Sequence, residues 1–187
     1  MKMKFHRLAI LIFCLPWMPA PAAPLAVGDA LPALVAKDQF GKDFTLNTNI
    51  QFLLVVTEMA CAKAANKKLA EQGAGFLELH HAACLMDIHA MPAVARFFAL
   101  PKMRKYPHRI GLVDSAGTLA GFPVQPGRVT VLALTPTGHI QAISYWNPAS
   151  EPVAGCFQPS PVLRQALTNG CVQCKKIIIA VKDVKLE

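Results

Sequence analysis

The first candidate for chemistry is Cys61, which stands where a strand-forming run, residues 51–57, gives way to a helix-forming run that begins near Ala60. Disulfide exchange commonly uses two cysteines separated by two residues, and the partner position here is Ala64. A cysteine at the start of a helix is favoured as the thiolate by the helix dipole and the free backbone N–H groups, and the thiolate is the nucleophile. The sequence therefore carries half of a redox motif.

Two interpretations of Cys61 are open at this stage. In one, Cys61 is a reactive nucleophile, an interpretation that the charge of Lys63 favours and the charge of Glu58 opposes. In the other, Cys61 is a small apolar side chain that packs among alanines in a degenerate site. The motif Cys61-x-x-Ala64 favours the second by a small margin, and predicts a protein that acts by binding, with weak or no dithiol activity.

Cys84 is the candidate for a resolving thiol. It is predicted near the carboxyl end of the second parallel strand, while Cys61 lies just beyond the carboxyl end of the first, and such ends meet at one edge of an α/β sheet. Cys84 could then form a disulfide with an oxidised Cys61, provided that their Cα atoms come within about 7 Å. A buried structural thiol is the alternative, and the commoner role for such a cysteine.

Side chains that bind soft metals gather between residues 80 and 89, and they are His80, His81, Cys84, Asp87 and His89. Thiolate with imidazole suits copper or zinc, so copper handling through Cys61, Cys84 and a histidine is a second alternative function. The spacing is not that of a zinc finger, and ordinary surface histidines are favoured. We therefore predict no metal site and no cofactor.

The tail contains a second pair of cysteines, Cys171 and Cys174, with redox-pair spacing. They follow a predicted helix end and precede a β-branched run, whereas a catalytic pair opens a helix. A disulfide in the tail, which can involve Cys156, is the favoured interpretation. Five cysteines follow residue 22, and an odd number leaves at least one thiol free or paired with another molecule.

The first 22 residues have the pattern of a secretory signal peptide. A charged start with Lys2, Lys4 and Arg7 precedes an apolar run, residues 8–15, and small residues at 20–22 form the cleavage site. Prolines interrupt this stretch, so we expect no integral membrane segment after signal cleavage. The predicted location is periplasmic or secreted.

Cleavage leaves 165 of the 187 residues, enough for one domain with an apolar core. We predict a domain at 23–170 and a C-terminal extension at 171–187. The formal charge falls from +8 to +5 with the loss of the three signal cations, which does not favour nucleic acid; the expected partner is another periplasmic protein. The basic stretch 102–109 could attract an anionic partner or a membrane surface, although a solvated loop is the commoner role.

Apolar patterns predict the elements of the first half of the domain. Residues 34–46 form a hairpin around Gly41, and the apolar, β-branched run 52–56 forms a central strand that is buried on both faces. Good helix formers fill residues 60–72, and Gly73 ends that helix. A second strand is predicted at 76–83, followed by a loop and a helix that has Pro92 in its first turn and is closed by Pro101.

The second half is predicted to supply antiparallel strands and a last helix. A short apolar run at 110–113 is followed by two strands, 129–135 and 139–145, which a turn at 136–138 joins as a hairpin. A final helix fits residues 160–169. Two strands linked by a helix form a right-handed parallel unit. The predicted fold class is therefore α/β, with a mixed central sheet flanked by helices and an N-terminal hairpin, which is the element order of the thioredoxin-like superfamily.

The residues that open the domain also resemble a branch of that superfamily. The segments 27–32 and 38–42 resemble the start of peroxiredoxins of the alkyl hydroperoxide reductase and thiol-specific antioxidant type, and residues 106–132 are similar to YtfJ-like secreted proteins. The resemblance implies that the chain, if it is an enzyme, is a thiol-dependent oxidoreductase. It also implies that Arg128 corresponds to the active-site arginine of the peroxiredoxins.

Other family positions carry different residues. Peroxiredoxins place a threonine or serine three residues before the reactive cysteine and a proline seven before it, where this chain has Glu58 and Leu54. Thioredoxins place a cis-proline at the position that matches Val129. These departures favour the degenerate site. The alternative is a monothiol oxidoreductase or peroxidase that uses Cys61, Cys84 and Arg128 as catalytic residues.

Overall fold

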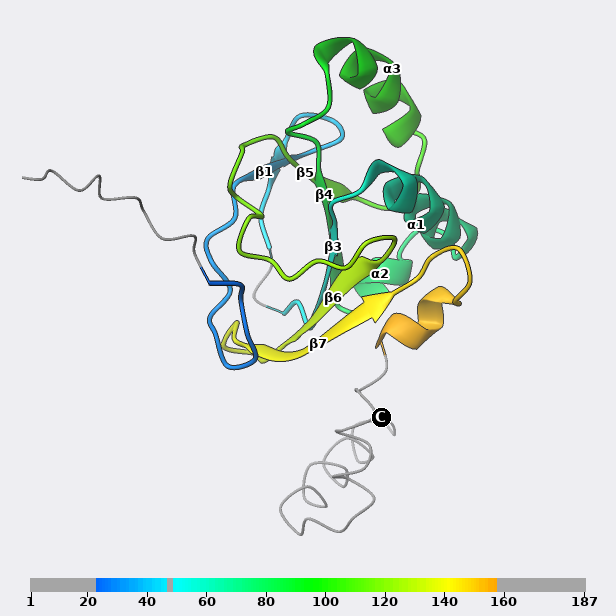
Figure 1. The fold of residues 1–187 in the computed structure, drawn as a ribbon. Helices are drawn as coiled ribbons and strands as arrows, with labels where there is room; N and C mark the ends of the chain where they lie inside the picture. Colours follow the sequence, from blue (N-terminus) through cyan, green and yellow to red (C-terminus); the bar gives the residue numbers. More distant parts are fainter. Residues whose placement is uncertain (1–22, 47–48, 158–187) are drawn as a thin grey trace, which may run out of the picture.

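The computed structural model describes residues 23–46 and 49–157. Seven strands form one mixed sheet in the order β2-β1-β5-β4-β3-β6-β7 (Figure 1). The elements in chain order are β1 (Ala36–Asp38), β2 (Asp43–Phe44), β3 (Phe52–Val56), α1 (Met59–Glu71), α2 (Phe76–Leu79), β4 (Ala82–Asp87), α3 (Ala93–Met103), β5 (Ile110–Val113), β6 (Val129–Leu134), β7 (Ile140–Trp146) and the 3-10 helix η1 (Val153–Phe157).

The strand pairings confirm the predicted fold class. β3 lies at the margin of the parallel part of the sheet, with β4 parallel on one side and β6 antiparallel on the other. β5 extends the parallel part, and the β1–β2 hairpin joins it through an antiparallel pairing of β1 with β5. The second predicted hairpin is the β6–β7 pair. The sheet thus combines a βαβ unit with an antiparallel hairpin at each margin.

The core consists of two apolar clusters, one on each face of the sheet. Successive residues of β3 divide between them, because side chains alternate along a strand: Leu54 and Val56 belong to the cluster that includes α1, and Leu53 and Val55 to the other. Figure 1 shows α1 and α2 together on one side of the sheet. On the opposite face the sheet is covered by apolar residues of the N-terminal segment and of the loop between β5 and β6.

The two longer helices follow from local sequence. α1 covers the predicted range and ends before Gly73, whose positive φ of 91° suits a residue without a Cβ. α3 begins at Ala93, so Pro92 directly precedes the first turn in which it was predicted, and the helix does not end at Pro101, which lies inside its last turn. Among the described residues, no helix is long and apolar enough to cross a membrane.

The predicted strand at residues 76–83 is wrong. Residues 76–79 form the short helix α2, which follows the positive-φ residue Gly75, and the strand β4 begins only at Ala82. The aromatic and leucine residues of this stretch suited a strand by composition, but they supply a helix face with Leu77 buried. The signal peptide, the predicted helix 160–169 and the cysteines of the tail lie outside the described residues.

Candidate functional site

Cys61 lies in the first turn of α1, beyond the carboxyl end of β3, so its predicted setting at a strand-to-helix junction is confirmed. The first hydrogen bond of the helix runs from the N–H of Ala62 to the carbonyl of Glu58, at 2.9 Å. The N–H groups of the preceding helical residues, including Cys61 itself, have no acceptor within the helix. This arrangement is the part of the site that favours a thiolate.

The surroundings of the Cys61 thiol have the opposite effect. The residue is only 6% exposed. Burial raises the pKa of the Cys61 thiol above its ordinary value, and the negative charge of Glu58 raises it further. The sulfur lies 4.0 Å from Oε2 of Glu58, to which the thiol donates a long hydrogen bond. Cys61 is therefore held as the protonated thiol at neutral pH, the less reactive form.

Glu58 also contacts a loop that is distant in the sequence. Its Oε2 accepts a hydrogen bond of 3.1 Å from the backbone N–H of Gly127, just before β6. The side chain therefore does not cap α1, although Glu58 occupies the capping position. The bond keeps a carboxylate beside Cys61 and links the start of α1 to the loop that faces it. No sequence pattern indicates a contact between residues 69 positions apart.

Cys84 lies inside the sheet, away from its edge. It is the third residue of β4, opposite Leu54 of β3, and none of its surface is exposed. Leu54 is two residues before the end of β3, so Cys84 lies about 7 Å from that end along the strand direction. The predicted position near the carboxyl end was wrong because β4 begins later than expected. Burial raises the pKa of Cys84 to about 12.

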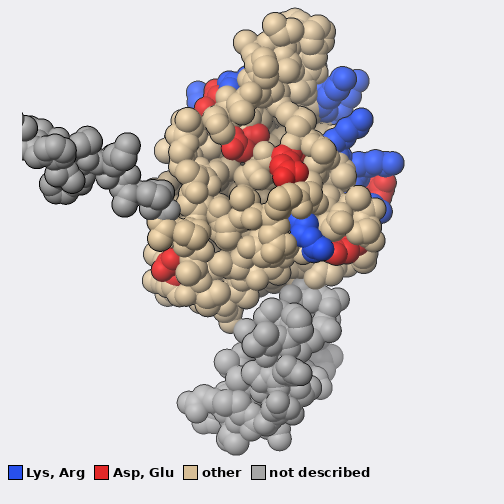
Figure 2. All heavy atoms as spheres, viewed as in Figure 1, with Lys and Arg blue, Asp and Glu red and all other residues tan. Residues whose placement is uncertain are grey.

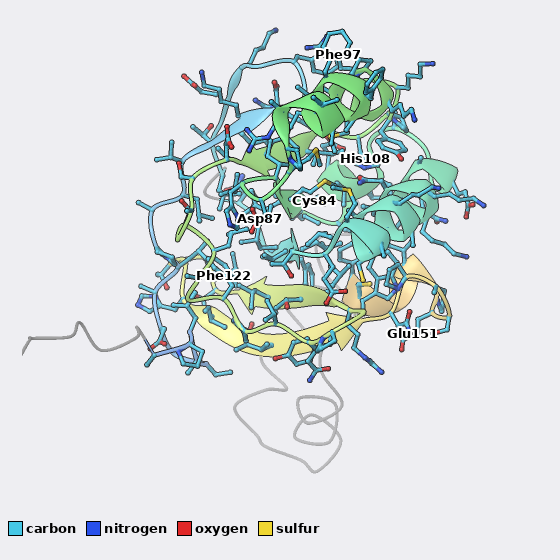
Figure 3. All side chains as sticks on the ribbon, turned by 45° about the horizontal axis from the view of Figure 1, so that its top comes forward. Cys84, Asp87, Phe97, His108, Phe122 and Glu151 are labelled. Atoms are coloured by element: carbon cyan, nitrogen blue, oxygen red, sulfur yellow. The ribbon has the colours of Figure 1, made fainter. Side chains whose placement is uncertain are left out.

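Cys61, Cys84 and Cys156 are free thiols in the described part of the chain. All three belong to the apolar cluster on the helix side of the sheet, and Figure 3 shows Cys84 in the interior. Burial, with a smaller contribution from the charge of Glu151, raises the pKa of Cys156 to about 12. A disulfide between Cys61 and Cys84 stays a prediction, and the pairing of the tail cysteines concerns residues outside the described ranges.

Arg128 forms its ion pair with Glu151 and not with Cys61. Its Nη1 lies 3.8 Å from Oε1 of Glu151, and both side chains are partly exposed. Within the described ranges, no ion pair or hydrogen bond joins Arg128 to Cys61. The peptide bond before Val129 is trans, since no cis peptide bond occurs in the part that the structure describes. The observed contacts therefore do not supply the positive charge that would stabilise a Cys61 thiolate.

The histidines of the predicted metal cluster have other neighbours. His80 stacks on Phe157, with ring centroids 4.6 Å apart, and Nδ1 of His89 lies 2.7 Å from Oδ1 of Asp87. Among residues 23–46 and 49–157, no three His, Cys, Asp or Glu side chains come together in a group that could hold a metal ion. The residues that were close in sequence are thus dispersed, because a helix end, a strand and a loop separate them.

A buried polar network that the sequence did not predict joins α1 to the segment after α3. Nε2 of His108 lies 2.9 Å from Oδ1 of Asn66, and the Gln39 side chain donates to the His108 carbonyl at 2.9 Å. His108 is 2% exposed, although it lies in the basic stretch predicted to be solvated. Burial lowers its pKa to about 4, so the ring is neutral, and Nδ1 has no hydrogen-bond partner among the described residues.

Comparison with known proteins supports the fold assignment. No protein-family model and no curated protein matches the chain. A peroxiredoxin-like protein from Aquifex aeolicus superposes with a TM-score of 0.52 and 14% identity, over 73% of this chain and 86% of that one. A structure described as the thiol:disulfide interchange protein DsbE from Chlorobium tepidum gives 0.51 and 11%, over 72% and 99%. At these identities the likeness shows the fold: the chain has a thioredoxin-like fold.

Proposed function

We propose that this chain is an exported protein with a thioredoxin-like fold that acts by binding, with weak or no dithiol activity. The observation that carries the proposal is the state of Cys61, a 6% exposed thiol whose pKa is raised by burial and by Glu58. Only a thiolate attacks a disulfide or a peroxide at a useful rate. Burial and the neighbouring carboxylate both reduce the thiolate fraction of Cys61.

The residue at position 64 supports the same proposal independently. In dithiol exchange one thiolate attacks a substrate disulfide, and a second cysteine then displaces the substrate from the mixed disulfide. Ala64 has no sulfur to perform the second step. A mixed disulfide on Cys61 would therefore persist until an external thiol released it, and turnover as a dithiol enzyme would be slow even if Cys61 reacted.

Export is the part of the proposal that rests on the N-terminal sequence. The charged start, apolar run and small residues before position 23 have the order that signal peptidase recognises. The expected partner is accordingly another periplasmic protein. Edman sequencing of protein recovered from the periplasm is expected to begin at Ala23. A first residue of Met1, with the protein retained in the cytoplasm, would contradict export.

Thiol trapping tests the state of Cys61. The folded protein is exposed to a small alkylating agent or to peroxide, and the modification of each cysteine is followed by peptide mass spectrometry. We expect Cys61 to alkylate slowly until the protein is unfolded, and to form neither a sulfenic acid nor a mixed disulfide. Cys61→Ser is the matched control for assigning the signal. Fast Cys61-dependent reduction of insulin or consumption of peroxide would overturn the proposal.

A second candidate function is a monothiol oxidoreductase or peroxidase, which the unpaired N–H groups around Cys61 favour. A Cys61 thiolate would attack the terminal oxygen of a hydroperoxide, giving Cys61 sulfenic acid and, after protonation, an alcohol. The Cys84 thiol would then attack the sulfenic sulfur, forming a disulfide with loss of water. Arg128 would have to leave Glu151 to stabilise the thiolate. Formation of a Cys61–Cys84 disulfide after peroxide treatment would support this candidate.

We do not propose copper handling. It needs Cys61, Cys84 and a histidine in one site, and the described residues offer no such group of ligands. Stoichiometric copper retention that is lost in Cys84→Ser would reverse this conclusion.

A further inference from the structure

The helix α3 presents an apolar face away from the protein. Val94, Phe97 and Phe98 are 71%, 74% and 62% exposed, and their spacing places them on one side of the helix. Figure 1 shows α3 standing out from the sheet, and Figure 3 shows Phe97 at the margin of the molecule. We call Val94, Phe97 and Phe98 the α3 patch. Large apolar groups gathered on a surface in this way mark an interaction site.

The α3 patch is held in a fixed position by hydrogen bonds on the inner side of the helix. Arg96 donates to the carbonyls of Met91, Ile88 and His89 at 2.8, 2.9 and 3.0 Å, and its Nη1 forms an ion pair of 2.6 Å with Asp114. At the other end, Nε of Arg104 donates to the carbonyl of Gln39 at 2.9 Å. Met103 anchors the last turn in the core. The exposure of the patch is therefore a feature of the folded protein.

Positive charge predominates around the α3 patch, although Arg96 is paired with the exposed carboxylate of Asp114. Residues 88–113 contain five Lys and Arg residues and no Asp or Glu. Lys102 and Lys105 are exposed just beyond the apolar residues. On the face that Figure 2 shows, the region of α3 is a projection without charged side chains, with Lys and Arg gathered along one flank and some Asp and Glu below it. An apolar projection beside cations is complementary to a surface that is anionic outside and apolar inside.

We propose that the α3 patch docks on an anionic lipid surface. Val94, Phe97 and Phe98 would enter the boundary between headgroups and acyl chains, while Lys102 and Lys105 remain at the level of the anionic headgroups. The attachment is peripheral, because α3 has 11 residues, and about 20 are needed to span a bilayer. It involves none of the cysteines, so it goes beyond the proposed function.

The shape of the patch favours lipid over another protein. A convex apolar projection is buried on all sides when it enters a fluid interface, whereas a protein partner needs a groove of matching shape. A second copy of this chain would bring the same cations against each other, which opposes a symmetric dimer through α3. Dimerisation and binding of a protein are therefore alternative outcomes of the test.

The test measures binding of the purified protein to vesicles of phosphatidylcholine alone and of phosphatidylcholine with phosphatidylglycerol. We expect sedimentation with the anionic vesicles, a weaker association at high salt and little binding to the neutral ones. The double variant Phe97→Ser/Phe98→Ser is expected to bind the anionic vesicles at least about tenfold more weakly than the wild type. All proteins compared carry the same termini, so residues outside α3 contribute equally.

Leu79→Ser is the matched control, because Leu79 is 76% exposed but belongs to α2, at the opposite end of β4 from α3. It is expected to bind like the wild type. A second variant, Phe97→Trp, reports on membrane entry directly through its tryptophan fluorescence, without a loss of binding. In the chain that begins at Ala23, which lacks Trp17, its emission should shift to the blue with anionic vesicles, while Trp146 is buried and should not respond.

Several results would overturn the inference. They are an absence of binding to anionic vesicles, equal binding by the folded double serine variant, and an unshifted Phe97→Trp emission. A dimer that Phe97→Ser/Phe98→Ser dissociates, without vesicle binding, would assign the patch to a second copy of the chain. If vesicle binding fails while Cys61 stays unreactive in the trapping experiment, the proposed function stands. If Cys61 reacts fast while vesicle binding is intact, the proposed function fails and the inference about the α3 patch stands.

Discussion

α1 and α3 each follow a parallel strand of the same sheet, yet they differ in how they meet it. α1 buries five residues, Cys61, Ala62, Ala65, Asn66 and Leu69, whereas α3 fully buries only Met103. α3 carries two phenylalanines and is nevertheless the more exposed helix. Apolar content therefore does not decide which of the two helices is the core helix.

The cause of the difference is the size and spacing of the side chains. Ala62 and Ala65 allow α1 to lie close to the sheet, where Leu69 fills the interior. α3 is held at its ends by Arg96 and Arg104, with Met103 as its anchor in the core. The α1 side of the molecule is therefore a completed core that encloses Cys61, while the outer side of α3 is a surface available for binding.

The largest expected effect comes from paired substitutions that test this comparison directly. Leu69→Ala should lower the free energy of unfolding by about 3 kcal/mol, because it opens a cavity in a well-packed core. Phe97→Ala should change it by less than about 0.5 kcal/mol, because Phe97 is mostly exposed. Urea denaturation of both variants is the measurement. Equal effects would show that α3 packs more tightly than its exposure indicates.

A somewhat smaller effect is expected from acid, through His108. Burial lowers the pKa of His108 from 6.5 to about 4, while the charge of Glu78 opposes the shift slightly. Below pH 6.5 the His108 ring therefore stays neutral in the folded protein, whereas in the unfolded chain it becomes protonated. The stabilising contribution is complete above pH 6.5 and disappears as the pH falls towards 4, and for this shift it amounts to no more than about 3 kcal/mol.

This pH dependence is measured by urea denaturation between pH 7 and 4, with His108→Gln as the control. The variant should show a shallower loss of stability on acidification than the wild type, whatever its stability at pH 7. Because His108 bonds Asn66, the result tests a polar link of α1 to the rest of the core. Identical slopes would assign the acid sensitivity to other groups.

Arg96 tests the other side of the comparison, the attachment of α3. Arg96→Gln removes the forked donor that binds the carbonyls of Ile88, His89 and Met91, and should lower the free energy of unfolding by about 1 kcal/mol. Amide hydrogen exchange should increase in α3 more than in α1. Arg96→Lys should recover only part of the loss, because a lysine has no planar fork. Uniform exchange in both helices would contradict separate anchoring.

The smallest expected effect concerns Cys61. Glu58→Gln removes the negative charge that helps to raise the pKa of the thiol, while an amide oxygen can still accept the N–H of Gly127. Alkylation of Cys61 at pH 7 should become about threefold faster. Glu71→Gln, at the far end of α1, is the matched control and should leave the rate unchanged. An unchanged rate in Glu58→Gln would mean that burial alone suppresses the thiolate.

Sequence patterns predicted most strands, helices and turns correctly, because these elements depend on interactions between residues that are near one another in the chain. The β-branched run of β3, the helix formers before Gly73 and the glycines of the two hairpins were all confirmed. The start of β4 was misplaced, because a short helix and a buried strand have similar apolar composition over a few residues. That shift moved Cys84 from the predicted edge of the sheet into its interior.

Three features follow from local sequence alone: the fold class, the position of Cys61 at a strand-to-helix junction and the absence of a second cysteine at position 64. The state of that cysteine depends on tertiary contacts, since its burial and the placement of Glu58 against Gly127 involve residues far apart in the chain. The tertiary structure likewise decided that α3 leaves its phenylalanines exposed. The physical reason is that propensity acts between near neighbours, whereas burial and pKa depend on everything that folding brings together.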